Sequence, residues 1–220
     1  MPIADKSTYL ADIVTVMKTE WPANRCVNIV CHGHSVPSGY FATPVVDSLN
    51  AYPHQLFAAL KHRYPLAVVN VIVTAIGGEN SEQGAARFAP EVLCHRPDVV
   101  TIDYALNDRG LGLERARVAW VSMIEAALAR GVRLILCTPT ADKTQLPSAT
   151  AEERRPLQEH AALVRSLANE YGVGLADALA AFELYVRSGG ELSDLMSWIN
   201  HPNRDGHQLV ATELLRWLPM

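Results

Sequence analysis

"VNIVCHGHSVPSGYF", residues 27–41, contains the transition that decides the fold, from an apolar run to a small polar turn. The apolar run begins at Cys26, ends at Cys31, and shows little strict alternation of apolar and polar residues. Such a run is typical of a strand covered on both faces, as in a parallel sheet. Gly33, His34 and Ser35 follow directly. Ser35 is therefore either an ordinary turn or helix-cap residue or a serine presented as a nucleophile.

Four more apolar runs of this kind follow along the chain, at residues 67–76, 98–106, 132–140 and 173–177. Segments with helical spacing of apolar residues lie between or after them, at residues 47–64, 115–131, 151–172 and 205–218. Alternating strands and helices predict right-handed crossovers, and hence an α/β fold, a three-layer α/β/α sandwich around a parallel sheet.

Length and composition narrow the class of protein. The 220 residues suit one α/β domain or two very small ones, and 49% hydrophobic residues can form a full-sized core. We expect a single domain over residues 1–220. A net charge of −4 and the lack of a basic stripe argue against nucleic-acid binding. Residues 1–21 do not resemble a signal peptide, and no apolar run is long enough to span a membrane. We therefore expect a cytoplasmic protein with no membrane partner.

The cysteines show no spacing typical of a zinc site or of a redox motif. We expect all four cysteines to be free thiols in a reducing compartment. The four are Cys26, Cys31, Cys94 and Cys137.

Polar residues follow the first three apolar runs and precede the last predicted helix. Ser35 follows the first run, Gly77 and Gly78 follow the second, Asn107 follows the third, and His201 precedes the helix. Ligands of parallel α/β sheets bind at the carboxyl ends of the strands, so these residues are expected to gather there. A serine, a histidine base and amide donors are what acyl transfer requires. Each short motif has an ordinary alternative as a turn or a cap, and their shared order and position favour the functional interpretation.

Four blocks of sequence carry a resemblance to a known family: "GHS" (33–35), "AIGGENS" (75–81), "ALND" (105–108) and "NHPNRDGH" (200–207). They resemble the SGNH hydrolases, also called the GDSL esterase/lipase superfamily, over almost the whole chain. The resemblance implies a flavodoxin-like sheet of five parallel strands. It also implies a serine esterase that needs no cofactor or metal. The nucleophile elbow of α/β-hydrolases does not fit, because Val36 and Pro37 follow the serine.

The resemblance assigns catalytic roles to matching residues. It implies that Ser35 is the nucleophile and His201 the base. The oxyanion would be held by the N–H groups of Ser35 and Gly78 and by the side-chain amide of Asn107. Gly78 matches the family better than Gly77 does.

The sequence departs from the family at three positions. His34 stands where the family has an aspartate, Ala105 replaces a glycine, and Trp198 stands where the family has the acid of its triad. Either a backbone carbonyl holds the His201 ring or another acid replaces the missing one, and Asp194 is the first candidate. Asp205 is expected to cap the last helix.

Further residues near the strand ends are candidates for substrate contacts, namely His34, Glu79, Asn80, Arg109 and Trp198. We expect His34 to hydrogen-bond around the serine block rather than to act as the base. Arg109 either contacts a polar substrate or pairs with Glu79 or Asp108. A metal site built from the histidines is not expected, because no carboxylate or thiolate stands at a recognised spacing.

The predicted substrate is a small polar ester, and O-acetyl groups on a carbohydrate are the favoured case. Two alternatives stay open: an acyltransferase that uses the same site, and a non-catalytic binding protein that kept the fold after losing the acid. Nothing in the sequence indicates an oligomeric state.

Overall fold

The computed structural model describes residues 2–220 and contains a parallel sheet of five strands. In chain order the strands are β1 (Cys26–Gly33), β2 (Val68–Val73), β3 (Val99–Asp103), β4 (Arg133–Cys137) and β5 (Gly174–Ala176). Their order across the sheet is β2-β1-β3-β4-β5, and each neighbouring pair is parallel. The strand order reverses between β1 and β3, which is where ligands bind in sheets of this kind.

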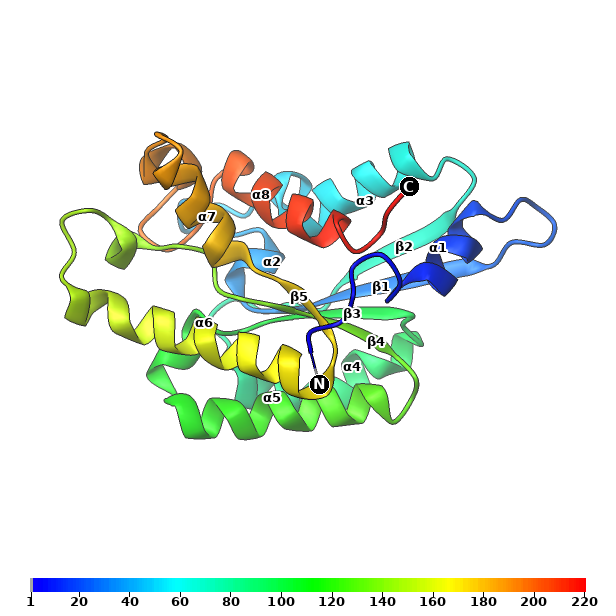
Figure 1. The fold of residues 1–220 in the computed structure, drawn as a ribbon, viewed down its shortest axis with the longest axis horizontal. Helices are drawn as coiled ribbons and strands as arrows, with labels where there is room; N and C mark the ends of the chain where they lie inside the picture. Colours follow the sequence, from blue (N-terminus) through cyan, green and yellow to red (C-terminus); the bar gives the residue numbers. More distant parts are fainter. Residues whose placement is uncertain (1) are drawn as a thin grey trace.

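Helices cover both faces of the sheet, as predicted. One face carries α3 (Tyr52–Arg63), α7 (Ala178–Arg187) and α8 (Arg204–Leu215), and the other carries α4 (Ser81–Glu91), α5 (Leu113–Leu128) and α6 (Ala151–Tyr171) (Figure 1). Two shorter helices, α1 (Ala11–Lys18) and α2 (Ser35–Ser38), lie close to β1. The three-layer α/β sandwich is thereby confirmed.

The helices that the periodicity missed are short. Among them, α4 contains Gly84 and Pro90, both poor helix formers. Its start is fixed by a capping box, in which Asn80 accepts from the backbone N–H of Gln83 and the Gln83 side chain accepts from that of Asn80. Local capping thus compensates for a weak apolar pattern.

The strand β2 differs from the prediction that every strand is covered on both faces. Val68 and Val73 are 51% and 36% exposed, because β2 forms an edge of the sheet. The central strands β1, β3 and β4 supply most of the buried core of the sheet. All four cysteines are free. Within residues 2–220, no helix is long and apolar enough to cross a membrane.

The end of β1 lies unusually close to the end of β3. Gly33 pairs with Asp103, and a Cβ atom at position 33 would lie 2.4 Å from the Asp103 carbonyl oxygen. Only glycine fits this approach. The close pairing places Ser35, two residues later, at the switch point between β1 and β3.

Candidate active site

Ser35 is the first residue of α2 and lies directly beyond the end of β1. Its side chain is nearly buried, with 7% of the residue exposed. The turn is held from both sides, since the N–H of His34 donates to Asp103 O and the hydroxyl of Ser38 donates to His34 O. The serine therefore sits on a rigid strand-to-helix junction.

His201 meets Ser35 from the segment that precedes α8. The Nε2 atom of His201 lies 3.0 Å from Ser35 Oγ, and its Nδ1 atom lies 2.8 Å from the Phe41 carbonyl oxygen. A carbonyl oxygen only accepts hydrogen bonds, so Nδ1 carries the ring proton and Nε2 presents its lone pair to the serine. This is the tautomer that a general base for Ser35 requires.

The carbonyl of Phe41 occupies the place at the His201 ring where an acid was expected. The Asp194 carboxylate does not contact this ring; it accepts from the Tyr185 hydroxyl at 3.1 Å and from the Glu191 N–H at 2.9 Å. Asp194 thereby belongs to the turn of helix η5 (Leu192–Leu195). Of the two arrangements left open by the sequence, the geometry has the backbone carbonyl.

The structure also places Asp205 and His207, the two other residues singled out near His201. The helix α8 is capped by Asn203, which accepts from the N–H groups of Asp205 and Gly206, so Asp205 lies in the first turn instead of capping it. The ring of His207 stacks on Phe41 with centroids 5.0 Å apart, and its Nδ1 accepts from Tyr52 N–H. His207 therefore supports the residue whose carbonyl holds His201.

Burial lowers the pKa of His201 below its usual value of 6.5. The hydrogen bond to Phe41 opposes this shift, and the nearby His34 adds to it. A lowered pKa keeps His201 neutral at neutral pH, which is the form that can accept a proton.

The loops after β2 and β3 meet through Asn107. Its side-chain amide donates to the carbonyl oxygen of Glu79 at 2.8 Å, which ties the two loops together. An amide nitrogen carries two hydrogens, so one donor of Asn107 is left after this bond. Gly78 has a φ of +85°, in the left-handed region, where a residue with a side chain would be strained.

Asp108 connects the loop after β3 to the start of α4 and to the helix α5. Its buried carboxylate accepts from Ser81 N–H at 2.8 Å and from the Trp120 indole N–H at 2.7 Å. Burial raises the pKa of Asp108, and both hydrogen bonds oppose the rise. Trp120 is fully buried, so it belongs to the core as well as to this anchor.

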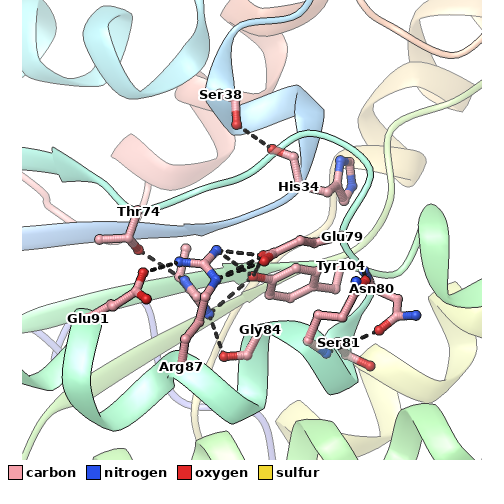
Figure 2. Close-up of polar contacts among 12 residues, drawn as sticks. His34, Ser38, Thr74, Glu79, Asn80, Ser81, Gly84, Arg87, Glu91 and Tyr104 are labelled. Atoms are coloured by element: carbon pink, nitrogen blue, oxygen red, sulfur yellow. Dashed lines mark hydrogen bonds and ion pairs between the residues drawn. The ribbon is translucent and has the colours of Figure 1, made fainter.

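Glu79 and Asn80 were predicted to contact substrate, but in the structure their side chains bind other residues of the protein. Figure 2 shows the Glu79 carboxylate directed at Arg87 and Tyr104. Arg87 binds it through Nε and Nη2, the latter at 2.6 Å. Asn80 caps α4 (Figure 2).

Arg109 and Trp198 are the predicted contact residues that remain accessible. Arg109 pairs with Asp142 at 2.8 Å, and not with Glu79 or Asp108, because those two carboxylates are already bound. Trp198 is 54% exposed. It borders an apolar hollow of about 250 Å³, which is lined by Lys143, Leu146, Leu192, Ser193, Met196, Trp198 and Ile199.

His34 is buried and close to the serine. Its Nδ1 accepts from Val36 N–H at 3.2 Å and lies 3.4 Å from Ser35 Oγ. It therefore caps the short helix α2, and its burial excludes direct contact with bulk solvent. No three His, Cys, Asp or Glu side chains in the described part of the chain are grouped to hold a metal ion.

The sequence pattern did not identify Phe41 as the residue whose carbonyl holds His201. Its contribution is a backbone carbonyl, which every residue possesses, so no side-chain motif could reveal it. Asp103, at the end of β3, contacts His34, and no sequence motif marked this contact either.

Residues 31–209 match the GDSL-like Lipase/Acylhydrolase family. No curated protein sequence matches the chain.

Two solved structures illustrate the likeness in fold. An acetylxylan esterase from Geobacillus stearothermophilus is 22% identical, with a TM-score of 0.75 over 88% of this chain and 94% of that one. An alpha/beta hydrolase enzyme from the metagenome of Lake Arreo, Spain, is 21% identical, with a TM-score of 0.76 over 93% and 100% of the two chains.

Proposed function

The chain belongs to the GDSL-like lipase/acylhydrolase family and is an ester hydrolase, and we propose that Ser35 and His201 hydrolyse short acyl esters of carbohydrates. One observation carries the assignment of the residues. The His201 ring places Nε2 at 3.0 Å from Ser35 Oγ while Nδ1 is held by the Phe41 carbonyl. This arrangement supports a nucleophile with its base in the required tautomer.

In the proposed first half of the reaction, His201 Nε2 takes the hydroxyl proton as Ser35 Oγ attacks the ester carbonyl carbon. The carbonyl electrons move to the oxygen, which gives a tetrahedral intermediate. When the intermediate collapses, the bond to the alcohol oxygen breaks and that oxygen takes the proton from His201. Ser35 is left acylated, and His201 is neutral again.

In the second half, water takes the place of the alcohol. His201 accepts a proton from water as the water oxygen attacks the acyl carbon, and returns the proton to Ser35 Oγ as the acid leaves. The Phe41 carbonyl stabilises the transient imidazolium less than a carboxylate would. This step therefore relies more heavily on the oxyanion donors.

The proposed oxyanion donors are the N–H groups of Ser35 and Gly78 and the second amide hydrogen of Asn107. The bond from Asn107 to Glu79 O supports this role, because it fixes the amide plane and leaves one hydrogen unused. The N–H of Ser35 lies in the first turn of a helix, where backbone N–H groups lack an intrahelical acceptor.

The substrate class is supported by the surroundings of the pair. A serine that is 7% exposed suits a small acyl group better than a long chain. Trp198, half exposed and three residues from His201, offers an aromatic face of the kind that packs on a sugar ring. A solved structure with the same fold is an acetylxylan esterase.

Hydrolysis of p-nitrophenyl acetate, butyrate and octanoate by the wild type and by Ser35→Ala tests the residue assignment. We expect the acetate to be cleaved fastest and Ser35→Ala to lose roughly 10³-fold or more in kcat. Equal rates for the wild type and the variant would overturn the role of Ser35. Product analysis with an added alcohol shows whether the acyl group goes to water or to an acceptor.

The carbohydrate assignment has its own test. We expect Trp198→Ala to raise KM for an acetylated xylo-oligosaccharide and to leave KM for p-nitrophenyl acetate unchanged. Trp21 is a matched control, because it is 83% exposed and precedes the amino end of β1, whereas Ser35 follows the carboxyl end of that strand. An equal rise in KM for both esters, or for Trp21→Ala as well, would contradict a sugar contact at Trp198.

A further inference from the structure

A buried carboxylate lies behind His34, on the side of the ring away from Ser35. The Oδ1 atom of Asp103 is 3.4 Å from His34 Nε2, and both side chains are almost fully buried. Asp103 also accepts from the Tyr52 hydroxyl at 3.4 Å, and its backbone oxygen accepts from His34 N–H at 3.2 Å. Residues 34 and 103 are therefore held together by the backbone of adjacent strands as well as by their side chains.

The contacts of His34 define which ring nitrogen carries the proton. The Val36 N–H donates to Nδ1, so Nδ1 must be bare and Nε2 must carry the proton. Among the described residues Nε2 has no aligned hydrogen-bond partner, and the charged atom that it faces is Asp103 Oδ1. A carboxylate at that place favours a protonated Nε2, which is the tautomer that the helix cap requires.

The same bare nitrogen lies beside the nucleophile, with 3.4 Å between His34 Nδ1 and Ser35 Oγ. In the opposite tautomer, an Nδ1–H group would point at the Val36 N–H and at the serine oxygen. It would displace the start of α2 and occupy a lone pair of Oγ that the attack on the ester needs. The tautomer of His34 thus affects both the position and the reactivity of Ser35.

We propose that Asp103 is a positioning residue for the esterase reaction, which acts by fixing the Nε2–H tautomer of His34 and, through it, the hydroxyl of Ser35. This inference rests on the proposed role of Ser35 as the nucleophile. In this arrangement the carboxylate of Asp103 supports the imidazole of His34, next to the nucleophile, and no carboxylate within residues 2–220 supports the imidazole of His201.

The kinetic test is a double-mutant cycle between positions 34 and 103. We expect Asp103→Ala to lower kcat about 10- to 100-fold and to change KM by less than about twofold. Asp103→Asn keeps one acceptor for His34 Nε2–H, so its kcat should lie between those of Asp103→Ala and the wild type. His34→Asn keeps an acceptor for Val36 N–H, because asparagine is a good helix cap with no tautomers. In that background, adding Asp103→Ala should change kcat by less than about twofold.

Asp98→Asn serves as the control, since Asp98 directly precedes β3, at the end opposite to Asp103, and its carboxylate accepts from the Asn28 N–H. It should leave kcat unchanged. If Asp103→Ala lowers kcat equally in the wild-type and His34→Asn backgrounds, Asp103 does not act through His34 and the proposal fails.

A second measurement needs no activity and no substitution of Asp103. Long-range ¹H–¹⁵N NMR spectra of the wild-type imidazoles at neutral pH should show a bare Nδ1 and a protonated Nε2 for His34, with assignment by loss of the signals in His34→Asn. A protonated Nδ1 would overturn the proposal. Because this spectrum does not depend on catalysis, a failure of Ser35→Ala to abolish activity would count against the proposed function alone.

Discussion

The His201 ring is held by a backbone carbonyl, whereas the loops that carry Asn107 are held by buried charges. The Phe41 carbonyl fixes the His201 ring. On the other side, the carboxylates of Glu79 and Asp108 bind an arginine, an indole and a helix N-terminus. A carbonyl is available wherever the chain passes, but a buried carboxylate must be supplied by one residue and fully paired. The position of Asn107 should therefore be more sensitive than that of the His201 ring to substitution of the side chains that support it.

Among substitutions in these loops, removal of the Asn107 amide should have the largest effect, if Asn107 has the proposed oxyanion role. We expect Asn107→Ala to lower kcat by about 10²- to 10³-fold, because one preorganised donor to the oxyanion is lost. Steady-state kinetics on p-nitrophenyl acetate measures this directly. A loss below about threefold, with the protein folded, would remove Asn107 from the proposed oxyanion hole.

Asp108→Asn tests the anchor below Asn107. The amide can accept from Ser81 N–H or from the Trp120 indole, but its N–H₂ group then faces the other donor. An unpaired buried donor costs about 1–3 kcal/mol of unfolding free energy, measurable in urea, and we expect kcat to fall roughly tenfold through displacement of Asn107.

A matched control for this anchor is Asp177→Asn. Asp177 caps α7 and binds Arg165 at the same edge of the sheet, beyond β5. It should lose stability with kcat unchanged. An equal fall in kcat for both variants would mean that the effect is global and not specific to the Asn107 loop.

Acid should lower the unfolding free energy, because a buried neutral histidine lies beside Phe41 and another lies beside Tyr104. Burial lowers the pKa of His207, under Phe41, to about 3, and that of His32, beside Tyr104, to about 4. Both pKa values lie below the 6.5 of an unperturbed histidine. As the pH falls below 6.5, the unfolded chain therefore binds more protons than the folded chain does. Their contribution to stability is present above pH 6.5 and is lost toward the folded pKa values.

The loss should be on the order of several kcal/mol by about pH 4, because one pKa unit corresponds to about 1.4 kcal/mol. Urea unfolding at a series of pH values measures it, and His207→Gln, which keeps an acceptor for Tyr52 N–H, should flatten the slope. An unfolding free energy that stays constant between neutral pH and about pH 5 would contradict this account.

Trp198→Asp should have the smallest effect, although it places an acid where the family has one. His201 Nδ1 is already bound to Phe41 O, and the side chain at position 198 is directed largely to solvent. We expect kcat/KM for p-nitrophenyl acetate to change by less than about twofold. A tenfold gain would show that the ring can leave the carbonyl for a carboxylate, and that the backbone support is replaceable.

The fold was largely predictable because its signals are local. The apolar runs match the five strands to within a few residues, and Gly172, with a φ of +61°, ends α6 at the last residue of the predicted helical segment 151–172. The helices α4 and α7 were missed, since a short helix is stabilised by its caps and by packing more than by a periodic pattern. The exposure of β2 was also missed, because the order of strands across a sheet is not written in any one strand.

The sequence by itself determined the parallel α/β layers and the residue types that meet at one edge of the sheet, because strand and helix periodicities and strand-end residues are local properties of the chain. Only the tertiary structure decided how those residues are supported. It joined His201 to Phe41, 160 residues apart, placed Asp194 in a turn, and brought Asp103 behind His34. The physical reason is that a hydrogen bond forms only when the donor and the acceptor are placed to within a few tenths of an ångström, and here the two groups lie far apart in sequence. A backbone carbonyl, moreover, has no signature in the sequence, because every residue has one.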